Sequence, residues 1–222
     1  TLADEYRLVA PDTVGQPGKS ASASPDAYGP WVVDVLDGLG IERAPMLGPS
    51  HGAGVLLETA VEAPDRIDAA ALVVPAGFGT PLSLALLRIV VPSVAYRFVP
   101  RRWLLERALA PMFSRPVATA EEVVVETIGR ALRTADLDAE FPGPDDPADL
   151  ADFGAPALVV TAERDPFFPG TRTCKRAGRA LPSLETCVML PEERHFLSPD
   201  GQAAATDRVR EFLRDATAGT DG

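Results

Sequence analysis

Short apolar runs recur along the chain and are separated by amphipathic stretches. Five runs are rich in Val, Leu and Ala, and they cover residues 6–10, 44–48, 70–75, 157–161 and 185–190. Continuous apolar runs without alternation are typical of strands that are buried on both faces. They predict a mostly parallel sheet that helices cover on both faces.

The stretches between these runs carry helical periodicity. We expect helices over residues 25–39, 51–63, 170–181 and 202–216. In the first of them, Ser24 can cap the helix, Pro25 suits its first position and Gly40 can end it. Strand and helix therefore alternate, which indicates an α/β fold.

The alternation stops in the middle of the chain. Residues 81–135 carry several helical patterns and no convincing strand, and residues 136–155 form a connector rich in Pro and Asp. We therefore expect an α/β core made of residues 1–80 and 151–222, interrupted by a helical insertion and linker at residues 81–150.

Charge and hydropathy disfavour two classes of partner. The net charge of -11 disfavours nucleic acid and anionic membrane surfaces, which attract clustered Lys and Arg. The apolar stretch 81–100 approaches the length of a membrane span, but it contains Arg88, Pro92 and Arg97. A charge at that depth in a bilayer is costly, so a buried or lid helix is favoured.

The chain has 2 cysteines and 2 histidines. Cys174 and Cys187 are interpreted first as reduced thiols in a cytoplasmic protein, and a single bridge between them remains an alternative. With only His51 and His195 available, a zinc cluster is not expected. The sequence predicts no metal and no cofactor.

A candidate nucleophile lies between the second apolar run and the following helix. Gly48-Pro49-Ser50-His51-Gly52 matches the pattern G-x-S-x-G. At a sharp turn from strand to helix, such a serine is held in strained backbone geometry and its hydroxyl is exposed above the sheet. The alternative is a glycine-rich turn whose Ser50 only caps the helix.

A serine hydroxyl needs a positioned base, and the base needs an acid. His51 directly follows the nucleophile and is badly placed to take its proton, so His195, in the loop after the last apolar run, is the predicted base. Asp165 follows the 157–161 run and is the predicted acid. Glu163 is the second choice, and Asp165 as an ordinary turn residue is the remaining alternative.

Four segments in this order resemble the α/β-hydrolase family: YRLVAPDTVGQPGKS, MLGPSHGAG, VVTAERDPF and ERHFLSPDGQ. The first is similar to a bacterial serine carboxylesterase subgroup. The resemblance implies that residues 81–150 are a cap and that residues 6–10 are the fourth core strand. It also implies that the first three strands are missing, along with the His-Gly loop that supplies one oxyanion-hole N–H. The remaining donor would be the backbone N–H of His51, and Pro49 before the nucleophile is unusual.

The predicted reaction is acyl transfer to water, with a small-to-medium, fairly apolar carboxylic ester as the partner. Leu82, Leu86, Phe98 and Trp103 are candidates for the pocket wall, although residues at helical spacing are more often core. A carbon–carbon bond hydrolase or a perhydrolase would use the same triad, and a non-catalytic binding protein on the same scaffold is the other alternative. A homo-oligomer is compatible with the sequence.

Overall fold

A four-stranded parallel sheet forms the centre of the computed structural model, which describes residues 2–15, 27–79, 84–134, 141–144 and 146–218. The strands lie side by side in chain order: β1 (Ala44–Pro49), β2 (Ile67–Val73), β3 (Ala157–Ala162) and β4 (Leu184–Leu190). All their carboxyl ends therefore meet at one edge of the sheet. β3 is buried along its whole length, as its unbroken apolar run predicts.

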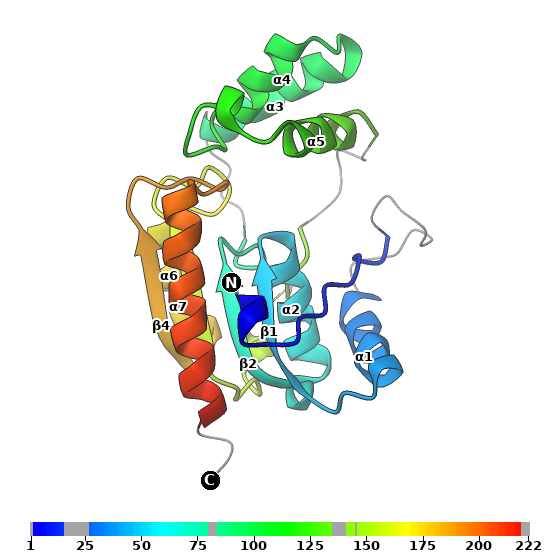
Figure 1. Cartoon of the computed structure of the whole chain (residues 1–222), viewed down its shortest axis with the longest axis vertical. Helices are drawn as coiled ribbons and strands as arrows, with labels where there is room; N and C mark the ends of the chain where they lie inside the picture. Colours follow the sequence, from blue (N-terminus) through cyan, green and yellow to red (C-terminus); the bar gives the residue numbers. More distant parts are fainter. Residues whose placement is uncertain (1, 16–26, 80–83, 135–140, 145, 219–222) are drawn as a thin grey trace.

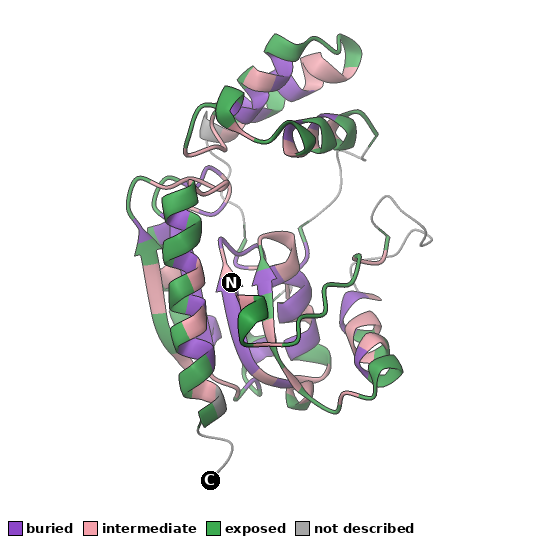
Figure 2. Cartoon of the chain, viewed as in Figure 1, coloured by how far each residue is buried: buried purple, intermediate pink, exposed green. Residues whose placement is uncertain are grey.

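Helices cover both faces of this sheet (Figure 1). α2 (His51–Glu62) and α6 (Gly170–Ala180) pack on one face, and α1 (Tyr28–Leu39) packs against α2. α7 (Pro199–Ala218) covers the other face through Ala205, Val209, Phe212 and Leu213. The buried residues concentrate in the two central strands, β2 and β3, and on the inner sides of these helices (Figure 2). The predicted fold class, an α/β sheet between helices, is confirmed.

Two short 3₁₀ turns and the glycine that ends α1 complete this part of the core. The 3₁₀ turns η3 (Pro64–Arg66) and η5 (Pro147–Leu150) lead into β2 and toward β3. Gly40 ends α1 in the left-handed region at φ 67°, where glycine carries no Cβ penalty, so the predicted helix end is confirmed. Ser24 and Pro25, the predicted start of the same helix, lie outside the described residues.

The predicted strand at residues 6–10 is wrong. A 3₁₀ turn, η1 (Leu2–Asp4), is followed by residues without regular structure, in which Leu8 and Val9 are exposed. A strand needs a neighbouring strand for its backbone hydrogen bonds, and the described part of the chain offers none beside this segment. Leu2 and Tyr6 instead pack against the cluster that α7 makes with the sheet.

Three helices follow β2 and lie beyond one end of the sheet (Figure 1). They are α3 (Leu84–Phe98), α4 (Arg102–Leu109) and α5 (Glu122–Thr134), with the 3₁₀ turn η4 (Val117–Thr119) between the last two. They share a hydrophobic cluster of their own, built around Leu105, Leu109, Val117 and Val125. Among the described residues, no helix is long and apolar enough to cross a bilayer.

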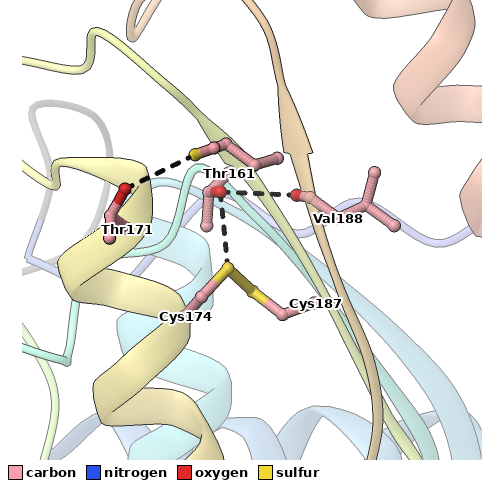
Figure 3. Close-up of a disulfide and its surroundings, with 6 residues drawn as sticks. Thr161, Thr171, Cys174, Cys187 and Val188 are labelled. Carbon is pink, nitrogen blue, oxygen red and sulfur yellow. Dashed lines mark hydrogen bonds between the residues drawn. A yellow bond between two sulfur atoms is a disulfide. The ribbon is translucent and has the colours of Figure 1, made fainter.

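Cys174 and Cys187 form a disulfide between α6 and β4 (Figure 3). The interpretation as reduced thiols is therefore wrong, and the bridge that the sequence left open is present. Neighbouring strand and helix bring the two cysteines together although 13 positions separate them. Structural disulfides are rare in the reducing cytosol, so this bridge weighs against the expected cytoplasmic location.

Candidate active site

Ser50 occupies the turn between β1 and α2 in a strained conformation. Its φ of 48° and ψ of -116° are rare for a residue with a side chain. Backbone bonds hold it there, because its N–H donates to Val73 O at 2.9 Å and its carbonyl accepts from the Ala53 N–H at 2.9 Å. A Cβ at Gly48 would lie 2.6 Å from the Ala53 Cα, so glycine is required for this close turn.

The imidazole of His195 lies between the hydroxyl of Ser50 and the carboxylate of Asp165. Ser50 Oγ is 2.8 Å from His195 Nε2, and His195 Nδ1 is 2.8 Å from Asp165 Oδ2. Along the chain, His195 is 145 positions from Ser50 and 30 positions from Asp165. Each of the three residues follows the carboxyl end of a strand. A carboxylate in this place orients the ring so that its other nitrogen can accept the hydroxyl proton.

The carboxylate of Asp165 is buried but fully hydrogen-bonded. Its residue is 3% exposed, and Oδ1 accepts the backbone N–H groups of Phe167 at 2.8 Å and Phe168 at 3.0 Å. The first oxygen thus fixes the turn, and the second is left for His195. A buried charge is tolerated only when it is paired in this way.

Aromatic rings enclose the imidazole. The ring of Phe167 meets it edge to face at 5.2 Å, Phe168 lies at 5.7 Å and Phe196 meets it at 5.5 Å with an angle of 88°. This apolar wall limits the water around His195. The sequence reasoning did not single out these phenylalanines, although Phe167 and Phe168 lie two and three positions after the predicted acid.

Glu163, the second choice for the acid, and the His51 ring make other contacts. Glu163 is exposed, and its carboxylate accepts the backbone N–H of Glu192 at 2.8 Å. His51 begins α2, and its ring meets Tyr28 edge to face at 5.5 Å. Burial lowers the pKa of His51 below its ordinary value of 6.5.

The predicted pocket residues are not gathered around Ser50 by any described contact. Leu82 lies outside the described residues, Leu86 is half-buried in α3, and Phe98 and Trp103 are 77% and 62% exposed. A cavity of about 370 Å³ lies where the segment after α4 meets the loops before Asp165 and His195, and none of the three candidate catalytic residues lines it. Leu86, Phe98 and Trp103 do not line it, so their role in a pocket stays a prediction.

The sequence model of a family described as "Alpha/beta hydrolase family" matches residues 1–209. An uncharacterized carboxylesterase of Bacillus subtilis is 25% identical over 221 residues, covering 96% of this chain and 72% of that protein. A 2-hydroxymuconate semialdehyde hydrolase of Pseudomonas sp. is 34% identical over 86 residues, covering 37% of this chain and 30% of that protein.

Among solved structures, the naproxen esterase of Bacillus subtilis superposes with a TM-score of 0.71 at 21% identity. The superposition covers 91% of this chain and 72% of that one. At this identity, the likeness establishes the fold.

Proposed function

Because the chain belongs to the alpha/beta hydrolase family, we propose that it cleaves carboxylic esters through an acyl-enzyme on Ser50. Membership confirms the predicted family and makes the protein a hydrolase similar to carboxylesterases. The step from the family to this reaction is supported by one observation above all. The hydroxyl of Ser50, the imidazole of His195 and the carboxylate of Asp165 form a continuous hydrogen-bonded series.

In the proposed reaction, the Ser50 oxygen attacks the ester carbonyl while His195 Nε2 takes its proton. The carboxylate of Asp165 stabilises the imidazolium that forms. The backbone N–H of His51, the residue after the nucleophile, supports the oxyanion. His195 then protonates the leaving alcohol. A water molecule that His195 deprotonates attacks the acyl-enzyme and releases the acid.

The surroundings of the base support the proposed substrate class. Phe167, Phe168 and Phe196 form an apolar wall around His195, which suits a small-to-medium apolar ester. We further infer that the helical unit of residues 81–150 acts as a cap over the core of residues 1–80 and 151–222. Its own hydrophobic cluster supports an independent unit of this kind.

A fluorophosphonate probe tests this proposal, because it phosphonylates only an activated serine. Intact mass of the folded chain should show one adduct, which Ser50→Ala abolishes together with hydrolysis of 4-nitrophenyl butyrate. Asp165→Asn keeps the acceptor for the Phe167 and Phe168 amides but removes the acceptor for His195 Nδ1–H. Its kcat should fall roughly a thousandfold to ten-thousandfold. A folded chain that takes no adduct would favour a non-catalytic binding protein.

One rival reaction has specific support. The hydrolase that matches over 86 residues is named for a 2-hydroxymuconate semialdehyde, which is not an ester. The same three residues could serve the hydrolysis of a carbon–carbon bond. A panel of aryl esters and diketones separates the two, because turnover of diketones with inert esters would reverse the preference.

A further inference from the structure

The segment that follows α4 lies along the loop that carries His195. Phe113 and Phe196 form a parallel bridge. The Phe196 N–H donates to Met112 O at 2.8 Å, and the Ser114 N–H donates to Phe196 O at 3.0 Å. The residue after His195 is therefore held by the helical unit and not by the sheet.

The residue before His195 is held by the same segment. The Arg194 N–H donates to Ser114 Oγ at 2.7 Å, and the Arg194 guanidinium donates to Ala110 O at 3.1 Å. The backbone N–H groups on both flanks of the imidazole thus have partners in residues 110–115. The loop that carries Asp165 contacts the His195 loop two positions before His195, where the Arg164 N–H donates to Glu193 O at 2.8 Å.

Side chains extend this contact to the imidazole itself. The rings of Phe113 and Phe196 stack at 4.4 Å with an angle of 18°, and Phe196 in turn meets the ring of His195. Burial raises the pKa of Glu193, but hydrogen bonds from Ser114 and Ser198, with Arg115 nearby, bring that pKa below its ordinary value. The carboxylate of Glu193 therefore stays charged and adds to the same contact.

We propose that Ser114 and Phe113 are positioning residues, which hold the His195 ring between Ser50 and Asp165 from outside the sheet. The proposal rests on the role of His195 as the base. Because β4 ends at Leu190, the sheet does not hold residues 194–196 directly. A displacement of residues 110–115 would release both flanks of His195 at once, so the position of the helical unit and the alignment of the base are coupled.

Ser114→Ala and Phe113→Ala test the proposal in the full chain. Displacing a catalytic group by about 1 Å can cost on the order of a hundredfold in rate. We expect kcat for 4-nitrophenyl butyrate and the rate of fluorophosphonate labelling to fall roughly tenfold to a hundredfold, with KM changed less than about twofold. Ser114→Thr retains a hydroxyl and should restore most of the rate.

Thr119→Ala is the matched control. The Thr119 hydroxyl also makes one hydrogen bond in the helical unit, at 2.8 Å, but its acceptor is Pro116 O and not the His195 loop. This variant should keep the parent's rates. Equal losses in Thr119→Ala and Ser114→Ala, or parent rates in both Ser114→Ala and Phe113→Ala, would overturn the proposal. Phe113→Leu replaces Phe113→Ala if the latter does not fold.

A spectroscopic measurement separates this proposal from the proposed function. The proton on His195 Nδ1 gives a downfield NMR signal while it is hydrogen-bonded to Asp165 and protected from exchange. Ser114→Ala and Phe113→Ala should broaden or abolish this signal, whereas Thr119→Ala should keep it. This NMR signal tests the positioning of His195 even if the parent protein hydrolyses no ester. An unchanged signal in both Ser114→Ala and Phe113→Ala would refute the positioning role.

Discussion

At the scale of single residues, Asp165 and His51 are both removed from water, but their neighbours differ. Asp165 is buried, and each of its two oxygens has hydrogen-bond donors. The ring of His51 is partly buried against Tyr28, and this burial lowers its pKa. Neighbouring donors therefore satisfy the carboxylate of Asp165, whereas burial disfavours the protonated form of His51.

The lowered pKa of His51 predicts a pH dependence of stability. In the unfolded chain, the imidazole takes up its proton as the pH falls through 6.5, whereas the folded protein resists that protonation. The free energy of unfolding should therefore fall as the pH drops from about 7 to 5. His51→Gln, which cannot titrate, should remove this contribution. Urea unfolding of parent and variant across that range measures it, and parallel pH curves for the two proteins would contradict it.

At the scale of elements, the disulfide joins the helix that follows the candidate acid to the strand that precedes the candidate base. α6 begins five residues after Asp165 and β4 ends five residues before His195, and Cys174 and Cys187 link them. Thr161 of β3 lies beside the bridge, with its hydroxyl 3.7 Å from the Cys174 Sγ (Figure 3). The bond therefore ties α6 to β4 beside Thr161 of β3.

Reduction of this disulfide should destabilise the protein. Closing a loop between cysteines with a sequence separation of 13 removes unfolded-state entropy worth about 3 kcal/mol. A reductant should lower the urea midpoint of the parent by a matching amount. A Cys174→Ser/Cys187→Ser double variant should have the lower urea midpoint both with and without reductant. If the reductant leaves the parent's midpoint unchanged as well, the bridge contributes nothing to stability.

At the scale of the whole molecule, the chain returns from the helical unit to the core through a close backbone contact. A Cβ at Gly54 of α2 would lie 2.2 Å from Pro142 O. The Gly143 N–H donates to Glu58 Oε1 at 2.9 Å. Two positions on α2, Gly54 and Glu58, therefore contact residues 142–143. The contact joins residues more than 80 positions apart, and it depends on the absence of a side chain at residue 54.

Gly54→Ala should therefore destabilise the protein by about 1–3 kcal/mol, because backbone must move to admit the methyl group. Gly38→Ala is the matched control. Gly38 also lies in a helix, but a Cβ there would meet nothing within 4 Å. That substitution should stabilise the protein by about 0.5–1 kcal/mol. Thermal unfolding of both variants checks the pair, and equal signs for the two changes would refute the contact.

Much of the fold was predictable because its determinants are local in sequence. The apolar runs at β1 to β4 and the periodicity of the helices between them predicted the observed α/β alternation. Ser50, Asp165 and His195 were predictable as candidates because each follows such a run. Parallel strands bring their carboxyl ends to one edge of the sheet whatever the details of packing.

What only the tertiary structure decided depends on which distant segments become neighbours. Residues 6–10 have the composition of a strand but lack a partner for their backbone, so no strand forms. Cys174 and Cys187 form a bond because α6 packs on β4, and Phe113 pairs with Phe196 because the helical unit meets the His195 loop. Composition and periodicity carry no information about such pairings, since each arises from contacts that exist only after the chain has folded.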